Sequence, residues 1–199
     1  MGSDRLGDQI RFILEIDKLK GVLRRTYLAD GSRRENSAEH SWHVAVMAAV
    51  LAEHANEPVN VGRVVRMLLV HDIVEVDAGD TFVYDPVGAV SKGERERAAA
   101  DRIFGLLPPD QGRELRGLWE EFEAAVTPDA RFAAALDRTM PVLHNIHTQG
   151  RAWRENRVTA DMVIARNSRI ADGSRELWEY VRALIERAVE SGHLAPAPG

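Results

Sequence analysis

The sequence contains no cysteine. This absence excludes disulfide bonds, thiolate metal ligands and a cysteine nucleophile. Any metal ion would have to be held by histidine nitrogens and carboxylate oxygens, a donor set that suits Mn, Fe, Co, Ni or Zn better than a soft metal. The 7 histidines and 31 acidic residues of the chain supply both kinds of donor.

Basic charge and long apolar runs are also scarce. Lysine and arginine number 26 against 31 acidic residues, and the net charge of -5 gives no basic field for binding DNA or RNA. A small anionic substrate is still compatible, because a metal ion and a few arginines can concentrate positive charge in one pocket. The most apolar stretch, 64–76, contains Arg66, His71, Asp72 and Glu75, so we expect no membrane span. The N-terminus lacks a signal pattern, which favours a cytoplasmic location.

Alternating strand patterns are nearly absent, whereas the helical period recurs along the whole chain. We therefore predict an all-α fold in which residues 1–199 form a single helical domain, with a disordered tail over 192–199. The segment 78–92 lacks helical periodicity and is expected to be a functional loop. The expected helices span residues 6–23, 37–55, 60–77, 92–107, 110–125, 128–149, 160–168 and 174–191.

Three sequence patterns mark expected helix starts. Asn36 with Glu39, and Ser91 with Glu94, resemble capping pairs, in which each side chain accepts a hydrogen bond from the other residue's backbone. Thr127 followed by proline resembles an N-cap and a first helical position.

The strongest local motif is the segment 71–75, which contains His71, Asp72 and Glu75 after an apolar stretch. On a continuous helix, Glu75 would share a face with His71. Burying these groups is costly unless they are paired or bound to a metal ion. The structural alternative is a helix end with a histidine near the C-terminal dipole and solvated acids.

Two further helices carry candidate ligands. His40 and His43 lie three residues apart, so both could face one site, although two histidines on an apolar helix are often core residues. Asp137 lies in an otherwise apolar segment and needs a partner, either a metal ion or an arginine. His144 and His147 follow it near the same helical face, where packing or exposure is preferred over a ligand role.

The order histidine, then histidine-aspartate, then aspartate, on three separate helices, resembles the HD superfamily. That superfamily uses a helical bundle whose facing helices hold a divalent metal ion, and the resemblance implies His40, His71, Asp72 and Asp137 as its ligands. Over about residues 8–145 the chain is similar to the 5'-deoxynucleotidase group, which includes YfbR-type enzymes and the human HD-domain-containing protein 2. The pattern His-Asp-x-x-Glu-x-x-x-Gly-Asp over 71–80 carries this closer resemblance.

The same resemblance implies roles for other residues. Glu75 matches the acid that positions or activates water, and Asp80 matches a second carboxylate near the phosphate. The assignment of acid and base between Glu75 and Asp80 stays open, because their environments set their pKa values. Arg25 matches a phosphate-binding arginine. Members of the group can carry a tryptophan near this arginine, where this chain has Tyr27, so the sugar preference is open.

Two more basic residues are candidate phosphate ligands. Arg33 precedes the first histidine, and a surface role is an equal alternative for it. Lys92 would reach the phosphate if the segment 78–92 folded over the pocket.

The resemblance implies a cytoplasmic, metal-dependent enzyme that hydrolyses (deoxy)nucleoside 5'-monophosphates to nucleoside and phosphate. Its cofactor would be a divalent metal ion, among Mn, Co, Fe, Ni, Zn or Mg, and its partner a second copy of the chain in a homodimer. One alternative is another HD phosphohydrolase acting on nucleoside triphosphates, cyclic nucleotides or guanosine polyphosphates. The other is a non-enzymatic protein that binds a metal ion or a nucleotide.

Overall fold

The computed structural model describes residues 4–84 and 86–198, without the side chains of residues 86–89. Within this part of the chain, helices dominate, which confirms the all-α prediction. Short 3-10 turns occur at η1 (Asp17–Gly21) and η2 (Ala52–His54). The α-helices are α1 (Arg5–Ile16), α2 (Ser37–Leu51), α3 (Val61–Val70), α4 (Glu75–Ala78), α5 (Pro86–Phe104), α6 (Pro109–Ala124), α7 (Pro128–His147), α8 (Arg151–Glu155), α9 (Ala160–Asn167), α10 (Ile170–Gly173) and α11 (Arg175–Glu190).

A small antiparallel hairpin interrupts the helices between η1 and α2, where no strand was expected. It pairs β1 (Leu23–Tyr27) with β2 (Arg34–Asn36), with Leu23 opposite Asn36 and Tyr27 opposite Arg34. Strands of five and three residues are too short to produce a clear alternating pattern in the sequence. The hairpin brings the segment before α2 against the middle of the molecule.

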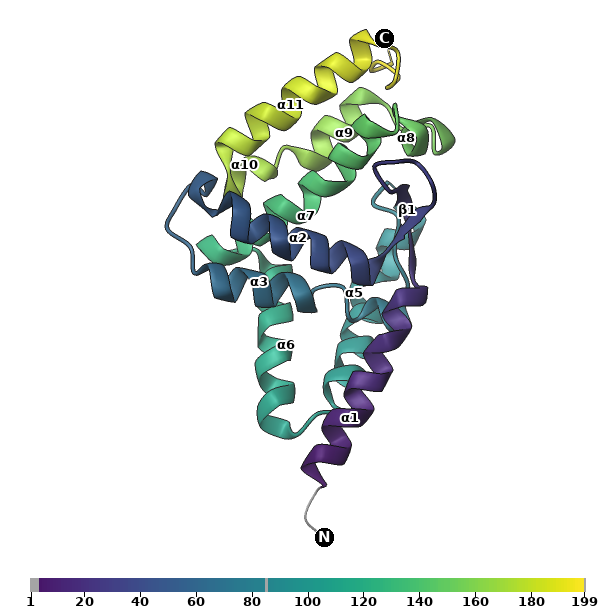
Figure 1. Ribbon diagram of the computed structural model, residues 1–199. Coiled ribbons are helices and arrows are strands. Elements are labelled where there is room, and N and C mark those ends of the chain that lie inside the picture. The colour runs from purple at the N-terminus through teal and green to yellow at the C-terminus, as the bar shows by residue number, and fades with distance from the viewer. Residues whose placement is uncertain (1–3, 85, 199) are drawn as a thin grey trace.

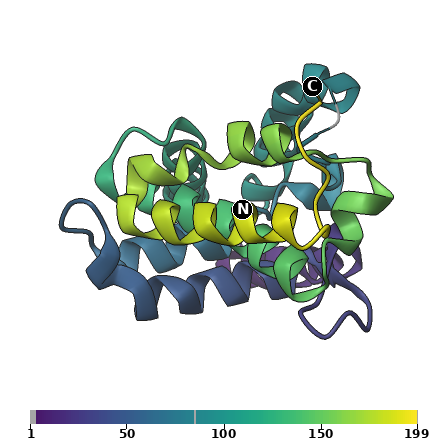
Figure 2. The same ribbon diagram turned by 90° about the horizontal axis from the view of Figure 1, so that it is seen from above.

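Helix α7 lies at the centre, with α2 and α3 packed against it and against each other. Helices α1, α5 and α6 form one end of an elongated molecule, and α9, α10 and α11 form the other, as Figure 1 shows. From above, α11 lies over α7 and runs roughly antiparallel to α2 (Figure 2). The N-terminus and the C-terminus lie at opposite ends of the long axis.

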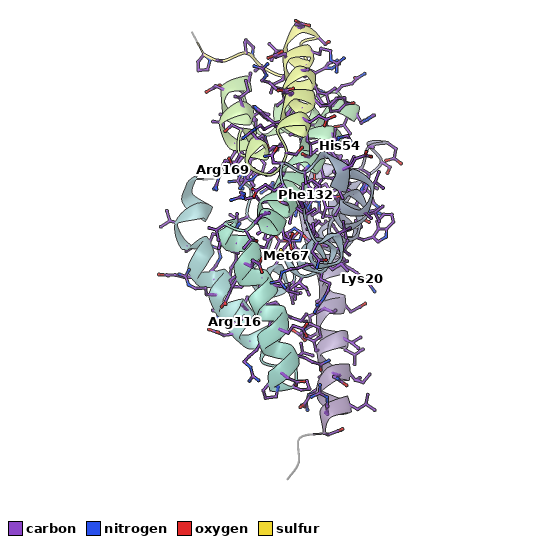
Figure 3. The ribbon with its side chains drawn as sticks, turned by 90° about the vertical axis from the view of Figure 1, so that its left-hand side faces the viewer. Lys20, His54, Met67, Arg116, Phe132 and Arg169 are labelled. Atoms are coloured by element: carbon purple, nitrogen blue, oxygen red, sulfur yellow. The ribbon has the colours of Figure 1, made fainter. Side chains whose placement is uncertain are left out.

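The central helices bury a continuous apolar core. Met67 of α3 and Phe132 of α7 are almost inaccessible to water and lie in the middle of the molecule in Figure 3, whereas Lys20 and Arg116 lie at its edges. A second apolar cluster packs α1 and α5 around Ile103, and a third packs α9 and α11 against α7 around Ile185. Because α7 contributes to the first and third clusters, its polar residues are held between well-packed apolar surfaces.

Two of the three expected helix starts are confirmed. Asn36 and Glu39 form a reciprocal capping box at the start of α2. Thr127 caps α7, with a proline in its first turn. Ser91 and Glu94 do not cap a helix, because α5 begins at Pro86 and both residues lie inside it. The expected loop 78–92 is therefore shorter than predicted, since a proline can occupy the first position of a helix.

The C-terminal segment differs from the expected disordered tail. Leu194 is only 1% exposed and packs in the apolar cluster of α9 and α11. The backbone N–H of Ala160 donates to the carbonyl of Ala195 at 2.9 Å. Burial of one leucine and this backbone bond fix the chain through residue 195, while residues 196–198 are exposed.

Among the described residues, none of the helices combines the length and the apolar character needed to cross a lipid bilayer.

Candidate metal centre

Helix α2 provides the first candidate ligand in its first turn. The capping box at Asn36 and Glu39 satisfies backbone N–H groups at the helix start and fixes where the helix begins. His40 follows within this first turn and is fully buried. A strong start signal therefore sets the position of the imidazole.

The second and third ligands lie where α3 ends. The backbone N–H of Ile73 donates to Val70, and that of Glu75 donates to Asp72, so a tight turn replaces the regular helix between α3 and α4. The turn lets the adjacent His71 and Asp72 side chains face the same point, which a continuous helix would separate by about 100°. The Nδ1 of His71 lies 2.7 Å from the Leu68 carbonyl, which fixes the tautomer with a free lone pair on Nε2.

Asp137 reaches the same point from the middle of α7. Pro141 stands four residues later inside this helix and has no N–H to donate to the Asp137 carbonyl. The regular hydrogen-bond ladder is thus interrupted at the turn that carries the aspartate. Proline inside a helix produces a local bend, and this position lies beside the pocket described below.

The four predicted ligands converge. The Oδ1 of Asp137 lies 3.0 Å from Nε2 of His40 and 3.6 Å from Nε2 of His71. The same His71 nitrogen is 3.1 Å from Oδ1 of Asp72. Donor atoms of His40, His71 and Asp72 all lie within 4.8 Å of one another. Two imidazole nitrogens and two carboxylates from three separate segments therefore surround one point.

Electrostatics at this point favour positive charge. Burial acts to lower the pKa of His71, but Asp72 and Asp137 outweigh it and raise that pKa to about 9. Burial likewise opposes ionisation of Asp137, yet hydrogen bonds with His40 and His71 hold its pKa well below the usual range. The carboxylates thus hold protons on the imidazole nitrogens around this point, and a divalent cation would be stabilised there in place of those protons.

The donor set fits a divalent metal ion. Nε2 of His71 is buried and has no hydrogen-bond partner among the described residues, although it faces the two carboxylates. A buried polar nitrogen without a partner is costly unless it has a ligand to bind. Histidine nitrogen with carboxylate oxygen is a common donor set for catalytic first-row metals.

Arg24 lies beside the cluster and was not predicted. Its Nη1 donates to Oδ2 of Asp72 at 2.8 Å, and its Nη2 lies 4.0 Å from Asp137. Burial acts to lower its pKa, but the surrounding carboxylates raise the pKa above the usual value, so the guanidinium stays charged. A fixed, buried fork of N–H donors next to the cluster is suited to phosphate oxygens.

The two predicted acids also lie at the centre. Glu75 is buried, and its Oε2 accepts a 2.6 Å hydrogen bond from the hydroxyl of Ser37. Burial and the charge of Asp72 raise the pKa of Glu75 to about 8. Burial also raises the pKa of Asp80, with Arg24 acting against it. Both carboxyl groups can therefore hold or release a proton closer to neutral pH than an ordinary acid.

A partly open pocket lies beside these groups, between β1, the 80–84 segment and helices α7, α8 and α9. Arg24, Asp80 and Asp137 line it on the side of the metal centre. The same segments and the helices α8 and α9 add aromatic, apolar and polar side chains, among them Phe82, Tyr84, Arg138, Asn145, Trp153, Arg166 and Asn167.

The three predicted substrate-binding residues have different positions. Arg25 lines the pocket, but it is exposed and its guanidinium carbon lies 6.0 Å from the centre of the Phe82 ring. Arg33 forms a two-fold ion pair with Glu39 at 2.6 and 2.9 Å on the surface and does not line the pocket. Lys92 lies 3.4 Å from Glu96, and its charge acts on Asp80.

Arg24, and not the predicted Arg25, lies beside the metal centre because of the direction in which each side chain leaves strand β1. Adjacent residues on a strand face opposite sides, so a shift of one residue changes which arginine faces the centre. Arg24 and Thr26 both approach Glu35 on the inner side of β1. Two consecutive arginines in a sequence without a visible strand pattern give no signal for choosing between them.

A helical bundle with a paired histidine and aspartate between its central helices defines a class of helical metal-binding domains. The chain matches the family described as "HD domain" over residues 16–178 and belongs to it. Membership of this family implies a divalent metal ion, which the donor set above can hold.

Relatives in the family give more detail. The chain is 34% identical to human 5'-deoxynucleotidase HDDC2 over 135 residues, covering 67% of this chain and 65% of the relative. It is 29% identical to the protein of the same name from Xenopus laevis, covering 75% of this chain and 73% of the relative. The chain thus spans about two thirds of the length of these relatives.

Solved structures agree with the fold. A crystal structure described as a predicted metal-dependent phosphohydrolase from Magnetospirillum magnetotacticum MS-1 has a TM-score of 0.91 and 58% identity, covering 96% of this chain and 99% of that one. The PH0347 protein from Pyrococcus horikoshii OT3, at 22% identity and a TM-score of 0.62, shares the fold, covering 91% of this chain and 98% of that one.

Proposed function

We propose that this chain is a metal-dependent phosphomonoesterase that hydrolyses (deoxy)nucleoside 5'-monophosphates to a nucleoside and inorganic phosphate. The observation that carries the proposal is the convergence of His40, His71, Asp72 and Asp137 beside a charged arginine and two acids with raised pKa values. The curated relatives named 5'-deoxynucleotidase support the choice of substrate class.

The pocket suggests how a nucleotide would bind. Its side next to the metal centre, with Arg24 and Asp137, would receive the phosphate, and Arg24 would donate to phosphate oxygens. The aromatic walls at Phe82, Tyr84 and Trp153 would contact the nucleoside. A substrate with a charged end and a flat apolar end fits such a pocket better than inorganic phosphate alone.

His40, His71, Asp72 and Asp137 would hold the metal ion. When bound, a divalent ion would offset phosphate charge and lower the pKa of water at the site. We keep Mn, Co, Fe, Ni, Zn and Mg as candidates, with the nitrogen ligands favouring the transition metals over Mg.

The acids would move the protons. Beside a bound cation, the raised pKa of Glu75 would fall and its ionised form would be favoured. The ionised Glu75 would then accept the proton of the attacking water as the water oxygen forms a bond to phosphorus. Asp80 would donate a proton to the 5' oxygen as the bond from phosphorus to that oxygen breaks. Ser37 would position Glu75 through its 2.6 Å hydrogen bond. Arg24 would hold the phosphate oxygens in line with the attacking water.

A substrate panel tests the proposal. The protein is stripped of metal with a chelator, its helical content is checked by circular dichroism, and each candidate metal is added back with ribo- and deoxyribonucleoside 5'-monophosphates. We expect metal-dependent phosphate release and a nucleoside product. Release of pyrophosphate or triphosphate from nucleoside triphosphates instead would favour another HD phosphohydrolase. Tight nucleotide binding without turnover under any metal would favour a binding protein.

The cytoplasmic location remains a prediction from the N-terminal sequence and the lack of a long apolar run, and the homodimer remains a prediction from the resemblance. Trp42, Val46 and Val50 form an exposed apolar stripe at four-residue spacing along α2, which supports an interface between copies. Light scattering coupled to size-exclusion chromatography would decide between a monomer and a dimer, and Trp42→Ser is expected to weaken a dimer built on this stripe.

A further inference from the structure

A second group of metal-ligating side chains lies behind His40, on the side away from Asp137. It comprises Glu35, His43 and His144, whose donor atoms all lie within 4.8 Å of one another. His40 separates the two groups, because its Nε2 faces Asp137 at 3.0 Å and its Nδ1 faces Oε2 of Glu35 at 3.3 Å. We call Glu35, His43 and His144 the rear cluster.

The helices that form the candidate metal centre also form the rear cluster. His43 lies three residues after His40 on α2, and His144 lies seven residues after Asp137 on α7. Spacings of three and seven return a helix to nearly the same face, so α2 and α7 each supply one residue to each group. Asp72 adds a carboxylate to the group with His40 and Asp137, and Glu35 of β2 adds one to the group with His43 and His144.

The rear cluster has an unsatisfied donor atom. His144 is 2% exposed, and its Nδ1 has no hydrogen-bond partner among the described residues, although it lies 3.6 Å from Oε2 of Glu35. Burial lowers the pKa of His144, with Glu35 acting against it, so the ring is neutral at pH 7. A buried neutral imidazole with an unpaired nitrogen beside a carboxylate has the chemistry of a metal ligand.

We propose that Glu35, His43 and His144 bind a second divalent transition-metal ion, distinct from the ion of the HD centre. Two imidazole nitrogens and one carboxylate, with a fourth position left for water, form a donor set that suits Zn²⁺ best. Nitrogen donors disfavour Mg²⁺ and Ca²⁺, which prefer oxygen ligands. The half-exposed His43 provides access for the ion and for water.

Binding of an ion requires the three donor atoms to move closer together. Donor atoms around a tetrahedral ion with bonds of about 2.0–2.1 Å lie about 3.3 Å apart. The 3.6 Å separation of Glu35 and His144 is close to this value, and the donor atom of the half-exposed His43 starts within 4.8 Å of both. The rings of His43 and His144 have centroids 6.2 Å apart and are inclined by 56°.

A competing arrangement needs no second ion. Glu35 could instead only accept a hydrogen bond from Nδ1 of His40 and so orient that ligand, as carboxylates often do behind metal-bound histidines. In that case His144 would have a structural role, and the chain would bind one ion. The two arrangements therefore differ in stoichiometry, which can be measured without any substrate.

Metal counting on the full chain tests the proposal. The protein is stripped with a chelator, loaded with excess Zn²⁺, desalted and analysed for bound zinc by mass spectrometry, with calorimetric titration of the stripped protein alongside. We expect two ions per chain for the wild type, one for His144→Ala, one for Asp137→Ala and none for the double variant. His147→Ala, an exposed position one turn further along α7, is the matched control and should keep both ions.

Three results would overturn the proposal: one ion per chain in the wild type, two ions retained by His144→Ala, or loss of both ions in Asp137→Ala. If His144→Ala does not fold, the half-exposed His43→Asn replaces it with the same expectation, and circular dichroism confirms the fold of each variant. The count does not depend on phosphate release, so an inactive but doubly loaded protein would refute the proposed function and leave the second site standing.

Discussion

The two sides of His40 present similar donors in different surroundings. On the Nε2 side, two carboxylates and a second imidazole meet next to Arg24 and two acids, and Asp137 also lines the pocket. On the Nδ1 side, Glu35 and two imidazoles meet behind the pocket, and none of the three is among the described residues that line it. The same pair of helices supplies both groups.

This comparison shows that side chains able to bind a metal ion do not by themselves make a catalytic site. Candidate ligands are present on both sides, but among the described residues it is the Nε2 side that adjoins the pocket, the charged Arg24 and two acids with raised pKa values. An open metal position supports catalysis only where a substrate can reach it. We therefore expect turnover to depend on the Nε2 side, and the rear cluster to affect stability and the orientation of His40.

The largest expected effect is that of Asp137→Ala. It removes the carboxylate that both imidazoles face, and we expect loss of the ion at the HD centre and a fall in kcat/KM of at least about a thousandfold, because the metal supplies several kcal/mol. Phosphate release and metal content are measured together. The exposed Asp101→Asn is the control. Normal turnover in the variant would remove Asp137 from the site.

Glu75→Gln sharpens the comparison by separating binding from chemistry. Loss of a proton carrier costs about 10²–10⁴-fold in rate. We expect kcat to fall in that range while zinc content and nucleotide affinity stay near the wild-type values. Steady-state kinetics with metal analysis would check this. If the variant were fully active, Glu75 would not be the base, despite its position beside Asp72.

Arg24 connects the two sides, since it contacts Asp72 at 2.8 Å and lies 3.6 Å from Glu35. Truncating one member of a buried charge pair costs about 2–5 kcal/mol. Arg24→Ala should therefore lower kcat/KM about a hundredfold, and the exposed Arg25→Ala should lower it less than about tenfold. The paired measurement uses one nucleotide and one metal for both variants. A larger loss for Arg25→Ala would favour the sequence-based assignment.

Asp80→Asn tests how the leaving oxygen is protonated. An alkoxide such as the 5' oxygen needs a proton as it departs, whereas p-nitrophenolate leaves without one. We expect a loss of about a hundredfold with a nucleoside monophosphate and little loss with p-nitrophenyl phosphate. Comparing the two substrates on one preparation removes errors in enzyme concentration. Equal losses for both substrates would give Asp80 a positioning role instead.

Several candidate ligands could be picked out from the sequence because they lie next to recognisable helix starts and helix ends. His40 follows a capping box, and His71 with Asp72 ends an apolar helix, so each is fixed by short-range signals. Asp137 is a lone acid in an apolar helix. The helical period predicted a helical domain, and the resemblance to the HD superfamily implied that these residues meet at one metal ion.

The remaining features depend on contacts that no local pattern contains. The choice between Arg24 and Arg25 is set by the register of a short hairpin, where one step reverses the face. The three-residue spacing left open whether His40 and His43 face one site. In the structure Glu35 of β2 faces Nδ1 of His40, and the two rings belong to different clusters. The first residues of α5 were predicted as a loop, because Pro86 and Gly88 are as typical of a loop as of a helix start.

The smallest expected effect is that of Arg33→Ala, which tests how far the site extends beyond these residues. Arg33 lies two residues before Glu35, yet its side chain is 56% exposed and paired with Glu39. Exposed ion pairs contribute about 0–1 kcal/mol, so the midpoint of urea unfolding should move little. We expect kcat/KM to stay within about twofold of the wild type, because a charge in water acts weakly on a buried site. A larger loss of kcat/KM would mean that Arg33 leaves Glu39 and reaches the phosphate when a nucleotide binds, and the pocket would then extend to the surface of β2.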